Sequence, residues 1–293
     1  MFKSIFSSAP LTHGKALVYI AFAAGLWSTS GLFIKLIALN PLAIAGLRSA
    51  IAAFYVILLM RGSLRFNFSR PQLTGALAYA LTMILFVTAT KTTTAANAIL
   101  LQYTAPVSTA LFGAWILKEK VARFDWVIIT VVISGMALFF IDKISPTGLW
   151  GNIMAVASGV TLSYFVICMR IQKDASPLET VIVGNLLTAV LCLPFYFQQA
   201  PSAIEWVILL YMGILQIGFS FLLFSKAIKY VAALESVLIQ TIDPLLNPIW
   251  VWLIIGETPG RWAILGGIVV VGSVTLRSII SNKKAIKAET GTV

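Results

Sequence analysis

The sequence predicts an all-α integral membrane protein of ten transmembrane helices, arranged as two inverted five-helix repeats. Three observations lead to this: the composition, a succession of ten apolar runs, and an internal repeat. Of 293 residues, 59% are hydrophobic and 11% are charged, whereas a soluble chain carries about 25% charged residues. The charges are too few to cover a water-facing globule, so most of the surface must face lipid.

Ten apolar runs, each bounded by charge, proline or glycine, follow one another with short connections. A transmembrane helix needs about 20 such residues, so ten spans take roughly 200 residues and leave no room for a soluble domain. The runs lack the alternation of barrel strands, and helices satisfy their own backbone polar groups in lipid. The expected spans are 15–38, 42–60, 71–90, 94–117, 124–141, 148–169, 177–197, 205–225, 232–255 and 261–280.

The distribution of basic residues predicts the orientation. With a cytoplasmic N-terminus, sixteen of the 21 Lys and Arg residues fall in cytoplasmic segments and four in external ones, while Arg48 lies within a span. Cytoplasmic loops of membrane proteins carry such an excess. We therefore expect a multi-pass protein of the inner (plasma) membrane with both termini cytoplasmic. The first run lacks a cleavage-site break and is interpreted as an anchor, not a signal peptide.

The second half of the chain repeats the first. Residues 89–138 align without gaps on 227–276 at an offset of 138, so that Gln102 meets Gln240 and Pro106 meets Pro244. Five spans per half is an odd number, so the second half enters the membrane from the opposite side. Inverted repeats are typical of secondary transporters, which hold substrate near the midplane between the halves. The expected units are 1–145, 146–281 and a cytoplasmic tail, 282–293.

Several classes of function are excluded by what the chain lacks. The one histidine, His13, precedes the first span, and the motifs for zinc proteases, nucleotide loops and dinucleotide sites do not occur. Cys168 and Cys192 lie in apolar runs without CxxC spacing, so no metal site or disulfide framework is expected. The net charge of +11 is spread over short loops, without a nucleic-acid motif. We expect no enzyme, cofactor, metal or nucleic-acid partner.

Four stretches resemble the EamA-type family of the drug/metabolite transporter superfamily. They are "GLWSTSGLFIKL", "NPLAIAGLRSAIAA", "AANAILLQYTAPVSTALFGAWILKEKV" and the repeat copy "LESVLIQTIDPLLNPIWVWLIIGETP". The resemblance covers essentially the full length. It implies a ten-helix permease for small metabolites, often an exporter of amino acids or related compounds, and it does not give the substrate. Arg48 and Trp27 meet Gly184 and Thr161 in the other half, so any role they have is asymmetric.

Pro106 and Pro244 lie near the centres of the fourth and ninth expected spans. A proline inside a helix leaves the carbonyl four residues earlier unpaired, here that of Gln102 or Gln240. One interpretation is a packed kink in which the glutamine amide satisfies its own turn. The other is that the kinked helices bow around a cavity and offer free carbonyls to a ligand, and the two interpretations are compatible.

Asp243 lies in mid-span, where a charged residue costs about 2.5–3.5 kcal/mol on insertion scales. It should therefore face the bundle interior, at a depth similar to that of Arg48. In one hypothesis, Arg48 binds a substrate carboxylate or pairs with Asp243, and Asp243 holds an ammonium group or exchanges a coupling proton. In the alternative, the two form a fixed structural pair, or Arg48 extends toward the interface.

Other polar and aromatic residues in the spans complete the candidate substrate-binding set. Pockets are mostly apolar with a few convergent polar groups, and this set has that character. Taken singly, each such residue is more often a helix–helix hydrogen bond or an interfacial aromatic than a ligand contact. Asn97 and Tyr103 mark different faces of one helix. These candidates are Trp27, Ser30, Tyr79, Asn97, Tyr103, Tyr164, Asn185, Gln216 and Asn247.

The function expected from these features is secondary transport of small amphipathic or zwitterionic metabolites by alternating access. No ATP-binding motif is present, so a substrate or ion gradient must supply the energy, and a proton is one candidate ion. A channel-like facilitator and a non-transporting membrane scaffold or sensor are the alternatives. The partners expected are a small molecule and the lipid bilayer, and the sequence leaves the oligomeric state open.

Overall fold

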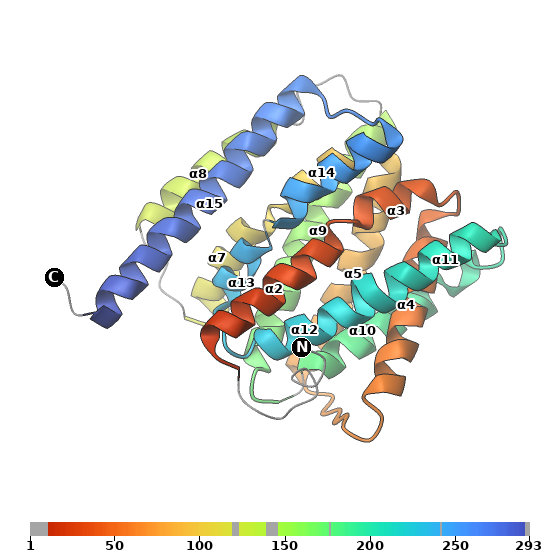
Figure 1. Ribbon diagram of the computed structural model, residues 1–293, viewed down its shortest axis with the longest axis horizontal. Helices are drawn as coiled ribbons and strands as arrows, with labels where there is room; N and C mark the ends of the chain where they lie inside the picture. The colour runs from red at the N-terminus through yellow and green to blue at the C-terminus, as the bar shows by residue number, and fades with distance from the viewer. Residues whose placement is uncertain (1–10, 119–122, 139–145, 176, 241, 291–293) are drawn as a thin grey trace.

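The computed structural model is a bundle of helices (Figure 1). It describes residues 11–118, 123–138, 146–175, 177–240 and 242–290, and these ranges contain no β-strand. The helices are α2 His13–Trp27, α3 Ser30–Leu36, α4 Pro41–Leu59, α5 Arg70–Thr92, α6 Ala95–Gln102, α7 Ala105–Ile116, α8 Arg123–Ala137, α9 Pro146–Ile171, α10 Pro177–Cys192, the 3₁₀ turn η2 Leu193–Phe195, α11 Ala203–Tyr211, the π-helix η3 Met212–Phe219, α12 Ser220–Ala227, α13 Ala233–Ile239, α14 Ile242–Ile255 and α15 Arg261–Thr290.

Eight helical stretches within the described ranges are long and apolar enough to cross a membrane. They are His13–Leu36, Pro41–Leu59, Arg70–Thr92, Ala95–Ile116, Gly148–Ile171, Pro177–Phe195, Ala203–Ala227 and Glu235–Ile255. Each coincides with one of the ten expected runs. The fifth and tenth runs correspond to α8 and α15, whose apolar stretches, Trp126–Gly135 and Arg261–Ser273, are shorter. An all-α, multi-pass membrane protein is thus confirmed, and the count of ten spans stays a prediction.

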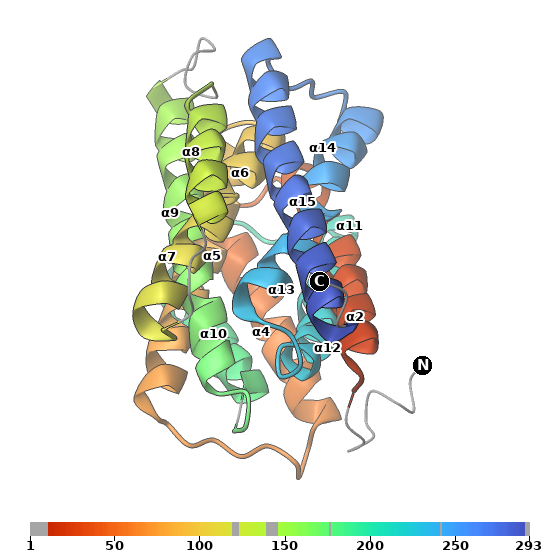
Figure 2. The same ribbon diagram turned by 90° about the vertical axis from the view of Figure 1, so that its left-hand side faces the viewer.

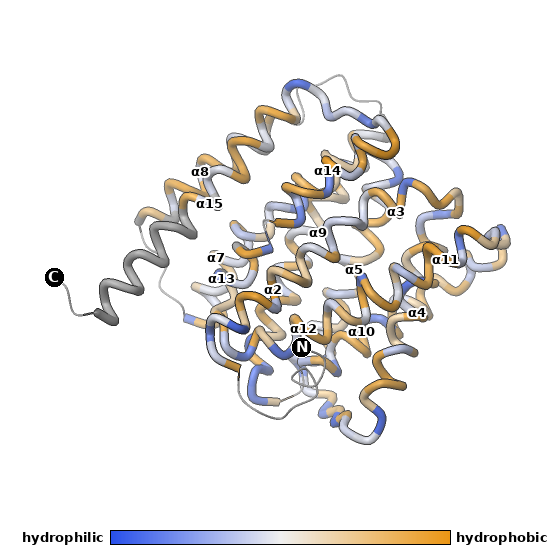
Figure 3. The backbone as a smooth tube through the Cα atoms, viewed as in Figure 1, coloured by the Kyte–Doolittle hydropathy of each residue, from blue (hydrophilic) through white to orange (hydrophobic). Residues whose placement is uncertain are grey.

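Hydrophobic residues predominate along the helices, and many hydrophilic residues lie near the helix ends and in the connections (Figure 3). Many large apolar side chains are exposed, among them Phe54, Trp115 and Ile204, which are 70%, 80% and 74% exposed. A soluble protein rarely tolerates such a belt, because contiguous exposed apolar patches promote association. In a bilayer the same side chains face acyl chains.

Helices from the two halves of the sequence pack against each other. α5 packs along α9, α4 along α10 and η3, and α2 along α12. In the other part of the bundle, α6 contacts α14, while α8 and α15 lie side by side as a pair at one edge (Figures 1 and 2). The centre of the bundle is therefore built by both halves.

Four of the spans are interrupted near their middle. The first changes direction at Ser28 and Thr29, whose hydroxyls donate back to the carbonyls of Gly25 and Leu26, at 2.7 and 2.8 Å. The stretch from α11 to α12 passes through the π-helix η3. Only the other two interruptions, between α6 and α7 and between α13 and α14, were expected from the prolines.

The breaks at the two prolines differ in detail from a simple kink. α6 ends at Gln102 and α7 begins at Ala105, so that Pro106 occupies the first turn of a new helix, where a proline costs nothing because its N–H would be unpaired anyway. Pro244 lies in the first turn of α14 in the same way. The chain therefore restarts a helix at each proline rather than bending through it.

Candidate functional site

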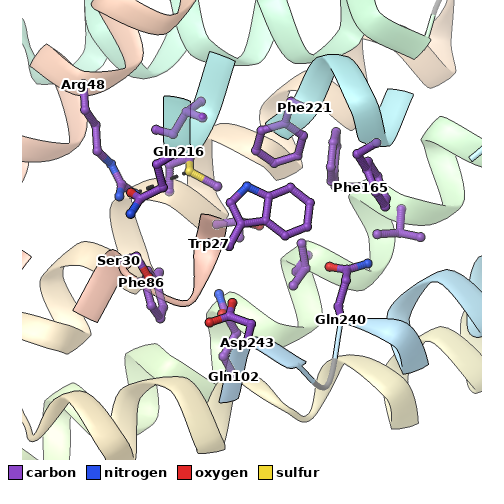
Figure 4. A pocket seen from close by; sticks show the side chains of 16 residues that line it. Trp27, Ser30, Arg48, Phe86, Gln102, Phe165, Gln216, Phe221, Gln240 and Asp243 are labelled. Carbon is purple, nitrogen blue, oxygen red and sulfur yellow. Dashed lines mark hydrogen bonds between the residues drawn. The ribbon is translucent and has the colours of Figure 1, made fainter. Parts of the chain in front are cut away.

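A cavity of about 70 Å³ lies where the interrupted spans meet (Figure 4). Both halves of the sequence line it, since α2 to α6 belong to the first half and α9, η3, α12 and the α13–α14 segment to the second. The lining residues are Trp27, Ser30, Arg48, Thr82, Met83, Phe86, Gln102, Leu162, Phe165, Val166, Gln216, Ile217, Phe221, Phe224, Gln240 and Asp243.

The helix interruptions place most of the polar lining. Trp27 ends α2 and Ser30 begins α3, while Gln102 is the last residue of α6. The remaining three belong to the second half: Gln216 lies inside η3, Gln240 precedes the α14 break, and Asp243 is the second residue of α14. Irregular backbone at membrane depth is tolerated where it lines a cavity, and π-helical turns often occur at functional sites.

Arg48 enters the cavity from α4, the one uninterrupted helix that contributes a charge to the lining. Its side chain is only 2% exposed, and its NH2 group donates to Met83 Sδ at 3.5 Å. Its Nε has no hydrogen-bond partner. Arg48 therefore does not extend to the membrane interface, and within the described residues no acidic side chain forms an ion pair with it.

Asp243 and Arg48 face the same cavity from different sides (Figure 4). The Oδ1 atom of Asp243 has no hydrogen-bond partner, and the fixed Arg48–Asp243 pair that was one alternative is absent from the ion pairs of the described residues. A buried polar atom left without a partner costs roughly 1–3 kcal/mol, more when charged. Neither side chain therefore forms an ion pair with another described residue.

Two further unpartnered atoms belong to the cavity lining. Trp27 Nε1 lacks an acceptor, and Gln216 Oε1 lacks a donor although the Gln216 amide nitrogen donates to Thr29 Oγ1 at 2.9 Å. With Arg48 and Asp243, the cavity therefore holds two unsatisfied N–H donors and two unsatisfied oxygen acceptors. Buried polar groups in proteins are normally paired. These four unpaired atoms belong to the lining of one cavity, while eight others, such as Ser49 Oγ and Thr109 Oγ1, lie outside the lining.

The two glutamines at the proline breaks point their amides, not their carbonyls, at the cavity. The Gln240 carbonyl accepts the N–H of Asp243 at 2.9 Å, and the Gln240 amide nitrogen donates to the Ser236 carbonyl at 3.0 Å. The Gln102 carbonyl lies against Gly159 of α9, at a point where a Cβ would not fit. The expectation of a free carbonyl is therefore wrong at Gln240, whose carbonyl accepts a backbone N–H, and stays a prediction at Gln102.

Seven of the thirteen substrate-binding candidates line the cavity, and six lie elsewhere. The second group makes hydrogen bonds that join neighbouring helices, which was the alternative interpretation for each. These bonds are Tyr79 Oη to Asn185 Oδ1 at 3.1 Å, Asn97 Nδ2 to Asn152 Oδ1 at 3.4 Å, Tyr103 Oη to the Val237 carbonyl at 3.4 Å, Tyr164 Oη to Thr74 Oγ1 at 3.3 Å, and Asn247 Nδ2 to Ser30 Oγ at 3.3 Å.

The apolar part of the lining was not identified from the sequence. Residues such as Leu162, Phe165 and Phe221 look like any other apolar residue in a chain that is 59% hydrophobic. No local pattern separates a side chain that faces a cavity from one that faces lipid or a neighbouring helix. Within the described residues, no cluster of His, Cys, Asp and Glu could hold a metal ion.

Outside the cavity, an ion pair and a histidine–glutamate hydrogen bond join the first span to the ninth at both ends. Lys35 Nζ lies 3.0 Å from Glu257 Oε2, and Glu257 Oε1 also accepts the N–H of Ala95, the first residue of α6, at 2.6 Å. At the other end of the span, His13 Nε2 lies 3.2 Å from Glu235 Oε1. Glu257 therefore both pairs with Lys35 and caps the N-terminus of α6, while its repeat partner Glu119 lies outside the described residues.

A comparison with family models identifies the chain. The model of the EamA-like transporter family matches it twice, over residues 14–141 and again over 149–279. The chain belongs to the EamA-like transporter family. It is therefore a membrane transporter and not an enzyme, and the family resemblance of the four sequence stretches is confirmed.

Curated relatives of the family include transporters with and without a known cargo. The chain is 28% identical over 218 residues to the uncharacterized transporter YdfC of Bacillus subtilis, covering 72% of this chain and 71% of the relative. It is 24% identical to an uncharacterized transporter of Archaeoglobus fulgidus, with 91% and 96% covered. The threonine/homoserine exporter RhtA of Escherichia coli K12 is 23% identical, with 70% and 72% covered.

A solved structure shares the fold. A crystal structure of a protein superposes on this chain with a TM-score of 0.71 at 21% identity, covering 92% of this chain and 98% of the other. This arrangement of helices therefore also occurs in a protein whose structure has been determined experimentally.

Proposed function

We propose that this protein is a secondary transporter that exports small zwitterionic metabolites, such as amino acids, by alternating access. The observation that carries the proposal is the group of four unpartnered polar atoms around one central cavity. An α-amino acid presents a carboxylate and an ammonium group a few ångströms apart, which complement two donors and two acceptors. The named cargo of RhtA, threonine and homoserine, belongs to the same chemical class.

Arg48 and Trp27 bind the carboxylate in this proposal. A guanidinium donates from several N–H groups and matches a carboxylate in geometry and charge, and the indole N–H of Trp27 is a second donor without an acceptor. Asp243 holds the ammonium group through its unpartnered Oδ1. When no substrate is bound, a proton on Asp243 lowers the cost of burying its charge, which is how substrate export and proton entry become coupled.

Two inverted repeats provide the alternating access. The family model matches each half separately, and the break after Gln102 recurs after Gln240, at the offset of 138 found in the sequence. A basic residue near the end of the first span of each half donates to the turn between the third and fourth spans: Lys35 to the Thr93 carbonyl at 2.8 Å, and Arg170 to the Lys229 carbonyl at 3.0 Å. These likenesses support units 1–145 and 146–281, ten spans and cytoplasmic termini.

The orientation has a direct test. Single cysteines at Ser4 and at Thr292, one near each end of the sequence, are introduced into a Cys168→Ala, Cys192→Ala background. We expect both to react with a membrane-impermeant maleimide in inside-out vesicles and neither in intact cells. Labelling of the two ends from opposite sides would contradict an even number of spans and, with it, the inverted repeat.

Counterflow in proteoliposomes tests the mechanism. A thermal-shift screen of small metabolites on the purified protein selects a candidate, and liposomes preloaded with it are diluted into a trace of its labelled form. A carrier accumulates the label transiently, because the inward- and outward-facing states exchange substrate. Saturable counterflow is the expected result. Flux without counterflow would indicate a channel-like facilitator, and absence of flux for every hit would favour a scaffold or sensor.

A further inference from the structure

A second hollow, separate from the central cavity, lies between α6, α14 and α15. Its volume is about 560 Å³, and it adjoins a smaller pocket of about 290 Å³ that shares Pro248, Ile249, Pro259 and Ile264 with it. Together the two form a lateral groove, to which α6 contributes Ala96 and Leu100, α14 residues between positions 244 and 252, and α15 residues between positions 263 and 272.

The groove exists because α14 and α15, although consecutive in the chain, pack on different neighbours. α14 packs on α3 and α6, whereas α15 packs along α8 (Figures 1 and 2). α15 comes close to α6 at Gly267, where a Cβ would lie 3.0 Å from Leu100 Cδ1, while no atom lies within 4 Å of the Cβ position at Gly272. α6 thus forms a floor, and space is left on either side of it.

The lining of the groove is apolar. Apart from Trp252 and Thr258, its side chains carry no polar atom. Leu245 and Ile268 at its rim are 48% and 65% exposed, so in a membrane this side of the groove is open to lipid. A polar metabolite would lose its hydration there and gain no hydrogen bond, which leaves hydrocarbon as the occupant.

The length of the groove fits one leaflet of a bilayer. Along α15 the lining runs from Ala263 to Gly272, which is about 14 Å at the rise of an α-helix. Half of a hydrocarbon core of about 30 Å is about 15 Å. An acyl chain that enters at the α14–α15 connection would therefore end near the middle of the membrane, at the depth of Pro244.

Arg261 lies at the shallow end of the groove. Positions 261, 264, 268 and 272 follow the spacing of a single helix face, and the last three line the groove. The Arg261 side chain is exposed and forms no ion pair with another described residue, since the nearby Glu257 pairs with Lys35. Basic residues at the membrane surface attract anionic lipid headgroups.

We propose that the lateral groove binds one acyl chain of an anionic phospholipid, whose phosphate lies at Arg261. The inference goes beyond the proposed function and does not depend on the cargo, so either can fail without the other. Pro244 lines the groove and its neighbour Asp243 lines the central cavity. The bound chain therefore packs against the back of the helix break that borders the cavity.

Two isoleucine variants of α14 test the acyl-chain site. Ile249→Trp fills the groove, whereas Ile254→Trp makes the same change at a residue that is 60% exposed and outside the lining. Delipidated protein in detergent is titrated with phosphatidylglycerol, and bound lipid is counted by native mass spectrometry. We expect one lipid on the unmodified protein and on Ile254→Trp, with binding at least fivefold weaker for Ile249→Trp.

The same lipid should raise the thermal unfolding midpoint of the unmodified protein and of Ile254→Trp but not that of Ile249→Trp, because a ligand stabilises the state that binds it. Equal lipid binding by the two variants would overturn the inference. A dimer that forms in place of lipid binding would overturn it too, and would make the groove an interface between two copies of the chain.

A second pair of variants tests the headgroup site. Arg261→Gln removes the basic residue at the groove, and Arg61→Gln removes an exposed arginine that follows α4. We expect a preference of about fivefold for phosphatidylglycerol over phosphatidylethanolamine, lost in Arg261→Gln and kept in Arg61→Gln. Glycerol 3-phosphate, which has the phosphate but no acyl chain, should not displace the lipid. Displacement by it would indicate a phosphate site alone and contradict the groove as the binding site.

Discussion

Arg48 and Asp243 are the two residues on which recognition depends in the proposed function. Each carries an unpartnered atom in the cavity, and no ion pair between the described side chains joins them. A charge removed from water without a partner is costly, so stability alone does not explain why both are present. A substrate with opposite charges at two ends would satisfy both sites at once.

Replacing Arg48 tests the carboxylate site. Arg48→Lys keeps the positive charge but loses the planar fork of donors, and Arg48→Met removes the charge while keeping most of the volume. We expect affinity for an amino acid to fall about tenfold for Arg48→Lys and further for Arg48→Met. The measurement is binding of an amino acid and of its amide, which lacks the carboxylate: the unmodified protein should prefer the acid, and both variants should lose that preference.

Replacing Asp243 tests the ammonium and proton site. Asp243→Asn preserves the shape of the side chain but removes the charge and the titratable proton. We expect zwitterion counterflow to fall at least tenfold and the residual flux to become independent of pH between about 5.5 and 8. Full transport with the pH dependence of the unmodified protein would remove Asp243 from both roles.

At the scale of elements, the helix interruptions create the site. A regular α-helix satisfies all its backbone groups internally and offers no space, whereas the breaks after Trp27, after Gln102 and before Asp243 each end a helix at the cavity. The π-helix η3 places Gln216 at the same depth. Bound between these segments, the substrate would contact several elements that can move independently.

Two glycines at equivalent positions of the repeat give a test of how α9 packs on the α6–α7 break. A Cβ at Gly159 would collide with the Gln102 carbonyl and Thr104 Oγ1, whereas at Gly25, its repeat partner in α2, no atom lies within 4 Å of the Cβ position. We expect Gly159→Ala to destabilise the protein by about 1–3 kcal/mol, because overpacking forces the backbone to shift. Gly25→Ala should be neutral or slightly stabilising, since alanine favours helix.

The measurement is the midpoint of thermal unfolding of each variant in the same detergent. Both substitutions make the same chemical change in a membrane-spanning helix, so the difference between them isolates the close contact with α6. If the two variants unfold at the same temperature, α9 does not approach the break as closely as the structure indicates.

At the scale of the whole molecule, the first and ninth spans are held together at both membrane faces. Lys35 pairs with Glu257 at one end, and His13 pairs with Glu235 at the other. Partly exposed ion pairs contribute little to stability, about 0–1 kcal/mol. They can nevertheless bias an equilibrium between two open states of similar free energy, because a shift of 1.4 kcal/mol changes a population ratio tenfold.

Removing either the Lys35–Glu257 contact or the His13–Glu235 contact should make the cavity more accessible from the end of the bundle where that contact lies. In a Cys168→Ala, Cys192→Ala background, Ser30→Cys places a reporter in the cavity. We expect Glu257→Gln to raise labelling by an impermeant maleimide several-fold from the face that carries Lys35, and Glu235→Gln to raise it from the opposite face. An increase from the same face in both variants would contradict the assignment of the two pairs to opposite ends.

Much of the fold was determined by the sequence. Composition and run length located every span that the structure describes as long enough to cross the membrane, since exclusion of polar backbone from lipid leaves few other solutions. The offset of 138 likewise related Gln102 and Pro106 to Gln240 and Pro244 before any coordinates were considered. The depth of Arg48 and Asp243 followed from the same reasoning, because a charge in mid-span must face the interior.

The composition of the cavity was decided only by the tertiary structure. From the sequence, Tyr79 and Asn185 were as plausible as cavity residues as Gln216, yet they form a hydrogen bond with each other between α5 and α10. Nothing in the sequence indicated that Phe165 and Phe221 line the cavity. The direction in which a side chain points depends on how its helix is rotated and where the helix is interrupted. The turn at Ser28 and the π-helix η3 both change that rotation, and neither contains a proline that would have predicted the change from the sequence. Hydropathy is set residue by residue, whereas a cavity is the space that several helices together leave unfilled.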